Sequence, residues 1–167
     1  MRARALSLAV VALSFAISCG PLSRADDWRI YQNDRYGTTI EYPSTFRPQP
    51  PPDADDGRAF KSADGGEFSV FASYGGIDSD LAQYRDSVVK NLDAGSVVTY
   101  QTHGGNWFVV SGTKGDKIFY ERHLLSHRGE MTEGFVITYP ASLKQTYDPI
   151  VARMAKSFRS GSGFQTQ

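Results

Sequence analysis

The second half of the sequence contains four segments that are rich in β-branched and aromatic residues and are separated by short turns. They span residues 97–102, 106–113, 117–126 and 131–139. Strands joined by such short connections pair antiparallel, since parallel neighbours need a crossover of about a dozen residues or more. The sequence therefore predicts an antiparallel meander in this half of the chain.

Residues 28–95 predict further strands and then a helix. The strands fall at residues 28–31, 36–42, 58–62 and 67–74. Pro43 ends the second of them, because proline has no amide hydrogen to donate to a strand ladder. The helix is predicted to begin with Asp78 or Ser79 as its N-cap and to end at Gly95.

A second helix with one apolar stripe closes the chain. The stripe consists of Leu143, Tyr147, Ile150, Val151, Met154 and Phe158. Its helical periodicity predicts that one face packs against the sheet. The order of elements indicates an α+β fold, an antiparallel β-sheet flanked by helices. We expect a single domain over residues 26–159, followed by a disordered tail of residues 160–167 that is rich in Gly, Ser and Gln.

The N-terminus has the order of features found in a secretory signal peptide. Two arginines precede the apolar run of residues 5–17, and small residues follow it. We predict that a signal peptide, residues 1–25, is cleaved between Ala25 and Asp26, which leaves a periplasmic or secreted protein. The apolar run is shorter than the roughly 20 residues that span a bilayer, so we expect no transmembrane span.

Cys19 permits a second interpretation of the N-terminus. The sequence around it resembles the site at which bacterial lipoproteins are acylated, and the protein would then be a lipid-anchored envelope protein tethered through Cys19. Cys19 is also the one cysteine of the chain. In either case no cysteine remains in the folded part, which excludes disulfides, thiolate catalysis and cysteine-bound metals there.

Removal of the signal peptide changes the charge balance. The whole chain has 18 Lys and Arg against 18 Asp and Glu. Three arginines and no acidic residue lie within residues 1–25, so the basic count falls from 18 to 15 and the net charge becomes −3. The mature chain also lacks a run of basic residues that would bind phosphates. We therefore expect no nucleic acid partner.

Residues 47–57 change in composition to prolines and aspartates, which favours a stiff exposed loop. A proline-rich segment loses little chain entropy on binding, and nearby carboxylates attract a basic partner. We therefore predict that Asp53, Asp55 and Asp56 take part in binding a protein partner. The alternative is that this loop only links two strands.

Neither the histidines nor the acidic loop form a recognisable metal site. His123 and His127 are four residues apart, which in a strand separates them by about 13 Å, too far for one zinc ion. Asp53, Asp55 and Asp56 do not follow the spacing of a calcium-binding EF-hand loop. We therefore expect no metal and no other cofactor.

Ser111, Glu121 and His123 are the residues from which a hydrolase site would be built, with the serine as nucleophile. A nucleophile elbow requires glycine two residues before the serine, and Val109 occupies that position. The sequence therefore favours a non-catalytic protein. An envelope hydrolase with an unrecognised site around these three residues is the alternative.

Three dipeptides and the closing helix carry a family resemblance. Tyr36-Gly37 opens a strand that ends in Tyr42-Pro43, and Tyr139-Pro140 precedes the apolar stripe of residues 147–158. In this order of elements the chain resembles the PsbP-like and DcrB-like group over residues 28–159. The resemblance implies an antiparallel sheet flanked by helices and an accessory or binding role in an exported or lumenal compartment. It assigns no functional residue.

Taken with the signal peptide, the resemblance predicts an exported, non-catalytic binding or accessory protein of the bacterial cell envelope. Its partner is expected to be another envelope protein. The envelope hydrolase and the lipoprotein tethered through Cys19 are the alternatives.

We predict that the mature chain begins at Asp26, because cleavage after Ala25 follows the small residues that a signal peptidase requires. N-terminal sequencing of the protein purified from the envelope fraction of its own cells checks this. An acylated Cys19 as the first residue would favour the lipoprotein, and an intact Met1 in the cytoplasm would contradict both interpretations.

Overall fold

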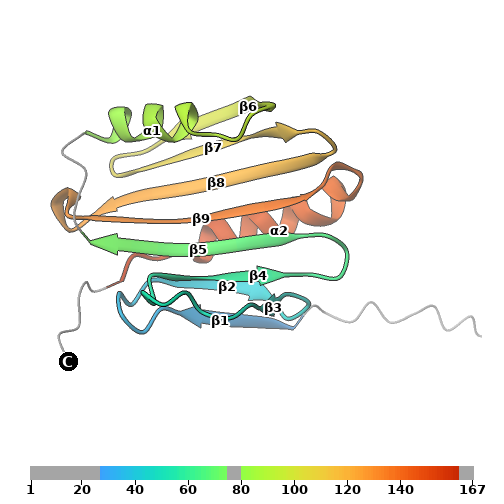
Figure 1. Ribbon diagram of the computed structural model, residues 1–167, viewed down its shortest axis with the longest axis horizontal. Coiled ribbons are helices and arrows are strands. Elements are labelled where there is room, and N and C mark those ends of the chain that lie inside the picture. Colours follow the sequence, from blue (N-terminus) through green and yellow to red (C-terminus); the bar gives the residue numbers. More distant parts are fainter. Residues whose placement is uncertain (1–26, 75–79, 162–167) are drawn as a thin grey trace, which may run out of the picture.

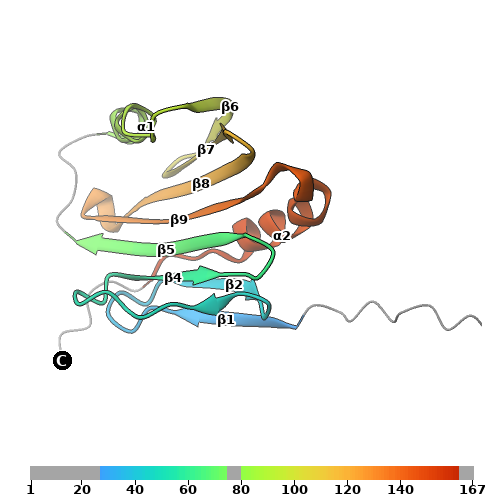
Figure 2. The ribbon, with the colours of Figure 1, turned by 45° about the vertical axis from the view of Figure 1, so that its right-hand side comes forward.

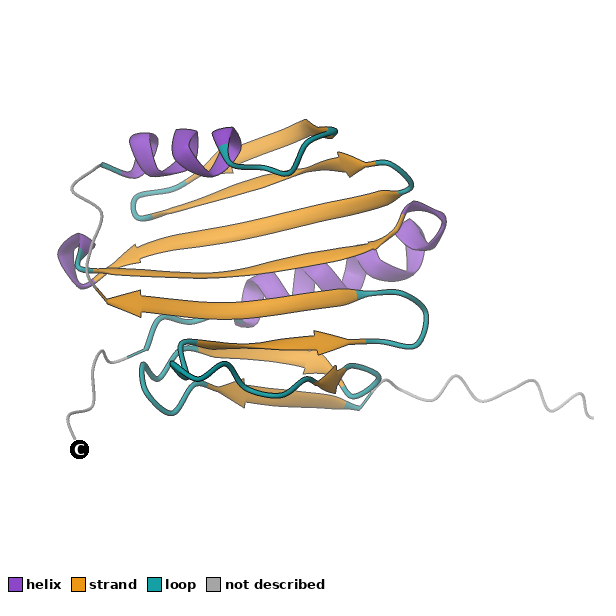
Figure 3. Cartoon of the chain, viewed as in Figure 1, coloured by secondary structure: helices purple, strands orange, loops and turns teal. Residues whose placement is uncertain are grey.

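The computed structural model describes residues 27–74 and 80–161, and strands are its main secondary structure (Figure 3). Seven strands form one antiparallel sheet in the order β3-β4-β5-β9-β8-β7-β6 (Figure 1). They are β3 (Arg47–Pro48), β4 (Gly57–Lys61), β5 (Glu67–Tyr74), β6 (Ser96–His103), β7 (Trp107–Lys114), β8 (Lys117–Ser126) and β9 (Met131–Pro140). The predicted α+β class with an antiparallel sheet is thus confirmed.

The predicted meander is present as β6-β7-β8-β9, in which each strand pairs with the next along the chain. β9 also pairs with β5 along its length, from Glu67 opposite Thr138 to Tyr74 opposite Met131. This long-range pairing places β9 and β5 in the interior of the sheet and leaves β6 at one edge and β3 at the other. The middle of the sheet is therefore built by residues that are distant in sequence.

One face of the sheet carries the main hydrophobic core. A separate hairpin of β1 (Trp28–Gln32) and β2 (Thr39–Pro43) packs on it together with α2 (Lys144–Ser157). The buried side chains of this core include Ile40, Tyr42, Phe46, Phe60, Phe68, Val70, Phe135, Ile137, Tyr139 and Phe158. This face buries most of the large apolar side chains and determines most of the stability of the domain.

The predicted stripe of α2 faces this core. Tyr147, Val151 and Met154 are buried, whereas Ile150 is only partly buried. Pro149 lies inside the helix. No helix among residues 27–74 and 80–161 is both long and apolar enough to cross a membrane.

The helix α1 (Leu81–Lys90) packs on the opposite face of the sheet, against side chains of β7 and β8. Its apolar residues contact Phe108, Val110 and Phe119, and none of its own residues is fully buried. In Figure 2, α1 lies near β6 and β7, away from α2. The ten-residue α1 therefore covers only part of its face of the sheet.

The boundaries of α1 differ from those that the sequence predicted. The N-cap is Asp80, whose carboxylate accepts a hydrogen bond from the Gln83 amide at 2.9 Å. Asp78 and Ser79 lie outside the described residues. The helix ends at Lys90, and Gly95, with a φ of 85°, lies in the turn that leads into β6. The prediction that the helix continues to Gly95 was wrong, because Asn91 already caps its C-terminus.

The prediction that residues 47–57 form a loop was also partly wrong. Arg47 and Pro48 form the short strand β3 and pair with Lys61 and Phe60 of β4. Proline is tolerated there because β3 is an edge strand, where an amide hydrogen is not required on the outer side.

The carboxylate of Glu133 in β9 is completely buried. Its Oε1 accepts hydrogen bonds from the Thr38 hydroxyl at 2.5 Å and the Gly161 amide at 3.0 Å. Its Oε2 accepts from the hydroxyls of Ser126 at 2.6 Å and Ser160 at 2.5 Å. Ser160 and Gly161, which the sequence analysis had placed in the tail, are thus hydrogen-bonded to the central part of the sheet, while residues 162–167 lie outside the described part.

We predict that Glu133→Ala lowers the free energy of unfolding by at least about 2 kcal/mol, because four donors lose their acceptor and a cavity remains. Urea unfolding of the purified protein measures the change. Glu130→Ala is the matched control, since Glu130 is exposed and its loss should cost within about 0.5 kcal/mol. Equal losses in the two variants would show that the buried hydrogen bonds of Glu133 do not stabilise the fold.

Candidate binding site

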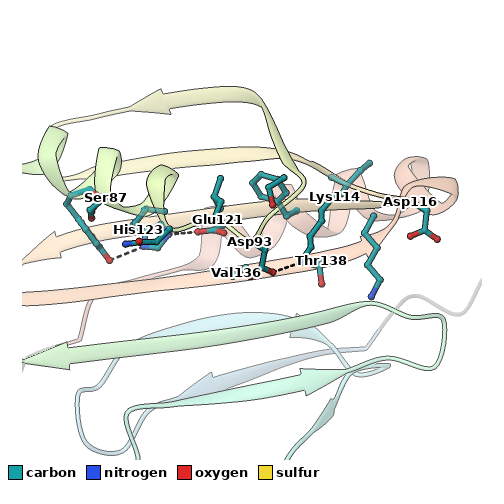
Figure 4. Close-up of a pocket in the computed structure, with 16 residues that line it drawn as sticks. Ser87, Asp93, Lys114, Asp116, Glu121, His123, Val136 and Thr138 are labelled. Atoms are coloured by element: carbon teal, nitrogen blue, oxygen red, sulfur yellow. Dashed lines mark hydrogen bonds and ion pairs between the residues drawn. The ribbon is translucent and has the colours of Figure 1, made fainter.

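A groove of about 700 Å³ lies between α1 and the adjacent face of the sheet (Figure 4). One wall comes from α1 and the turn that follows it, and the floor comes from β8 and β9. Because side chains alternate along a strand, Phe119, Glu121 and His123 of β8 share this face, with Val136 and Thr138 beside them on β9. The groove exists because α1 reaches β7 and β8 but leaves the β9 side of the face uncovered.

His123 is buried at one end of the groove among aromatic rings. Its ring stacks on Phe108 at a centroid distance of 4.8 Å, and Tyr84 meets it edge-on at 5.4 Å. Phe71 of β5 contacts it at 5.6 Å. Phe71 can approach because Gly134 stands opposite it on β9, where a Cβ would lie 2.6 Å from the Phe71 ring. These contacts fix the position of the imidazole.

Both nitrogens of His123 are hydrogen-bonded. Nδ1 lies 3.0 Å from the Tyr84 hydroxyl, and Nε2 lies 3.0 Å from Oε2 of Glu121. Burial, with the negative charge of Glu121 as a smaller cause, raises the pKa of Tyr84 to about 12. The carboxylate of Glu121 can only accept, so Nε2 carries the hydrogen and donates to it. In the neutral imidazole this leaves Nδ1 as an acceptor, and the Tyr84 hydroxyl, which keeps its proton at neutral pH, donates to it. The hydrogen bonds run in one direction, from α1 through His123 to the carboxylate.

The opposite end of the groove carries charged side chains near its opening. Lys114 forms an ion pair with Asp93, with 2.5 Å between Nζ and Oδ2. The pKa of Asp93 is lowered by the hydrogen bond and the charge of Lys114. Asp116 and Lys117, at the β7–β8 turn, complete this end. The groove is therefore polar at both ends and apolar between them.

The structure separates Ser111 from the other two hydrolase candidates. Glu121 and His123 are two residues apart on one face of β8 and are hydrogen-bonded to each other, but Ser111 faces the other side of the sheet. Its hydroxyl donates to the Phe119 carbonyl at 2.7 Å, and it lines a second cavity of about 450 Å³ beside α2. Ser111 therefore cannot be the nucleophile for the pair formed by Glu121 and His123.

His127 is exposed in the turn between β8 and β9, and its Nε2 lies 3.2 Å from the Gly161 carbonyl. It does not approach His123. Within the described ranges, no three His, Cys, Asp or Glu side chains cluster closely enough to hold a metal ion.

The predicted partner-binding residues lie near the opposite edge of the sheet, in the segment between β3 and β4. Asp53, Asp55 and Asp56 are exposed there. Side chains of the β1–β2 turn hold the backbone of this segment. The Asn33 amide donates to the Asp55 carbonyl at 2.9 Å, and the Arg35 guanidinium donates to the Ala54 carbonyl at 2.7 Å. The predicted cleavage site at Ala25 and Asp26, and Cys19, lie outside the described residues.

Sequence reasoning had found two of the polar residues of the groove and missed the third. The spacing of Glu121 and His123 in a strand placed both on one face. Tyr84 lies on an apolar stripe with Leu81, Val88 and Leu92 in the sequence of its helix, and nothing in the sequence shows where that helix contacts the sheet. A tyrosine on an apolar stripe was the available signal, since a buried phenol usually needs a hydrogen-bond partner.

No protein-family model and no curated protein sequence matches this chain. Among solved structures, cyanobacterial PsbP (CyanoP) from Synechocystis sp. PCC 6803 aligns with a TM-score of 0.59 and 15% identity, over 86% of this chain and 97% of that one. The chain has a PsbP-like fold. The sequence resemblance to that group is thereby confirmed for the fold.

A second similar structure is the Ran-binding protein Mog1p of Saccharomyces cerevisiae. It aligns with a TM-score of 0.55 and 12% identity, over 81% of this chain and 96% of that one. At this level of identity the likeness shows a shared arrangement of strands and helices and assigns no role to any residue of the groove.

We predict that Tyr84 makes the protein less stable at alkaline pH. The unfolded chain ionises tyrosine near its ordinary pKa of 10.0, whereas the folded chain holds this proton up to about 12. The contribution of this group to the free energy of unfolding is therefore fully present below about pH 10. It is lost as the pH rises towards 12, by up to about 2.7 kcal/mol. Urea unfolding between about pH 9 and about pH 11.5 measures the decline.

In Tyr84→Phe the decline should be smaller by that contribution. It should not disappear, because burial also raises the pKa of Tyr147 to about 12. An identical pH dependence in the wild type and the variant would show that Tyr84 ionises as freely in the folded protein as in the unfolded chain.

Proposed function

We propose that this chain is an exported, non-catalytic binding protein of the cell envelope and that the groove beside α1 is its ligand site. The groove itself carries the proposal. It is a preformed, largely apolar concavity with a few fixed polar groups, which is the usual character of a small-molecule site. In the described residues no serine, threonine or cysteine is hydrogen-bonded to His123, whose two nitrogens bond to Tyr84 and Glu121.

The fold supports a binding role over a catalytic one. Mog1p, which shares the fold, is a Ran-binding protein, and a surface for a protein partner is therefore compatible with this architecture. The proposed location in the periplasm, or outside the cell, rests on the signal peptide pattern of residues 1–25. The lipoprotein tethered through Cys19 would place the same domain at the membrane surface.

We further propose that Asp53, Asp55 and Asp56 contact an envelope protein partner. Their carboxylates are exposed, and the backbone that carries them is anchored to the turn between β1 and β2 by Asn33 and Arg35. An anchored segment loses little entropy on binding, so its charges can act on a basic partner without first ordering the chain.

Changing Asp53, Asp55 and Asp56 together to Asn should weaken capture of the partner from envelope extract, most clearly at low salt, because the attraction between exposed charges is screened as salt rises. The control changes Asp86 and Asp148 to Asn and Glu130 to Gln, which removes three exposed charges elsewhere. Circular dichroism must first show that both variants are folded. Equal capture by all forms, without dependence on salt, would leave the segment as a connector only.

The same preparation tests the non-catalytic part of the proposal. The wild type should not turn over nitrophenyl acetate above the rate of the buffer. Turnover that is lost in His123→Ala and kept in Ser111→Ala would contradict the proposal and favour a hydrolase centred on Glu121 and His123.

A further inference from the structure

The carboxylate of Glu121 is the most enclosed charge of the groove. Its side chain is only 14% exposed, and His123 beside it is 6% exposed. One oxygen of Glu121 accepts from His123 Nε2, and no hydrogen bond joins the other oxygen to a described residue. A carboxylate has room for further donors on both oxygens. The groove therefore contains an acceptor that a ligand can use.

The partners of this carboxylate fix its role. Tyr84 donates to His123 and His123 donates to Glu121, so the end of this chain of hydrogen bonds accepts and does not donate. A ligand group placed against Glu121 must carry a hydrogen atom on nitrogen or oxygen, and a positive charge there is favoured over a negative one. An anionic head group would be repelled at this end of the groove.

The remaining charges of the groove do not neutralise Glu121. Lys114 is already paired with Asp93, and Asp116 and Lys117 lie together at the β7–β8 turn. Figure 4 shows Glu121 next to His123, with Lys114 and Asp116 towards the other end. In the described part of the chain, no lysine or arginine forms an ion pair with Glu121, and the neighbouring Arg122 lies over the ring of Trp107.

The walls between the two ends are apolar and exclude a simple hydrated ion as the best occupant. Val88 of α1 and Leu92 of the turn after it face Phe119 of β8 and Val136 of β9 across the groove. A small inorganic cation would leave this surface in contact with water, whereas an organic ligand would bury it. The volume of about 700 Å³ is within the range of small-molecule sites.

We propose that the groove binds a small organic amine, whose protonated nitrogen pairs with Glu121 and whose apolar part lies between α1 and Phe119. This inference rests on the proposed binding function of the groove. His123 and Tyr84 are positioning residues, because they hold Glu121 in place and present its free oxygen to the ligand.

Three probes that differ only in their head group test the proposal: octylammonium, octanol and octanoate. Isothermal titration of the mature protein with each probe, below its micelle-forming concentration, should show octylammonium binding at least about tenfold more tightly than octanol, because a charge-assisted hydrogen bond is gained. Octanoate should bind most weakly. Equal affinities, tighter binding of octanoate, or no binding of any probe would overturn the assignment of an amine.

Two variants separate the head-group contact from the apolar contact. In Glu121→Gln, the amide oxygen can still accept from His123, so the fold should be kept while the preference for octylammonium over octanol is lost. In Val88→Trp, the indole fills the groove and should reduce the affinity for both probes. Glu130→Gln, an exposed charge outside the groove, is the control and should change neither.

The outcomes distinguish this inference from the proposed function. Tight binding of octanol or octanoate that Val88→Trp abolishes would retain the groove as a ligand site and reject the amine. Turnover in the nitrophenyl acetate assay would instead reject the non-catalytic binding function itself.

Discussion

The buried carboxylate of Glu133 is satisfied only when distant parts of the chain are assembled around β9. A charged group in the interior is costly unless it is hydrogen-bonded, and its four donors come from the approach to β2, the end of β8 and the chain after α2. Thr38 therefore fixes the N-terminal hairpin, and Ser160 and Gly161 fix the segment after the last helix. Alternative arrangements of these segments would leave the carboxylate or its donors without partners.

The hydrogen bonds of Glu133 order the segments that cover one face of the sheet. They do not order the segments on the other face. On the Glu133 face, the hairpin and α2 cover a continuous core in which Phe60 and Phe68 stack with their rings 4.3 Å apart. On the other face, α1 is the one helix among the described residues, and none of its side chains is fully buried. A face that is complete in its packing stabilises the domain, and a face that is incomplete leaves room for a ligand. The position of the groove thus follows from the unequal covering of the sheet.

The sequence predicted what depends on neighbouring residues. The meander followed from short turns between alternating strands, and the bounds predicted for β8 (Lys117–Ser126) agree with the structure because turns limit that strand on both sides. The pairing of β5 with β9 was not predictable from local patterns, since its two strands are separated by α1 and three further strands. Glu133 was missed although its position, between Met131 and Phe135 in alternation, indicates the core face.

The candidate site divides in the same way between local and distant contacts. The pairing of Glu121 with His123 depends on a two-residue spacing within one strand, but the third member, Tyr84, arrives from a helix whose docking no local pattern specifies. Its arrival changes the chemistry of the pair, because a protonated phenol occupies the nitrogen that a general base would use. The imidazole is stacked, buried and bonded at both nitrogens, so removing a proton from a substrate would require breaking a hydrogen bond that the core maintains. The same contacts hold the Glu121 carboxylate in a fixed orientation, which favours recognition of a ligand over catalysis at this site.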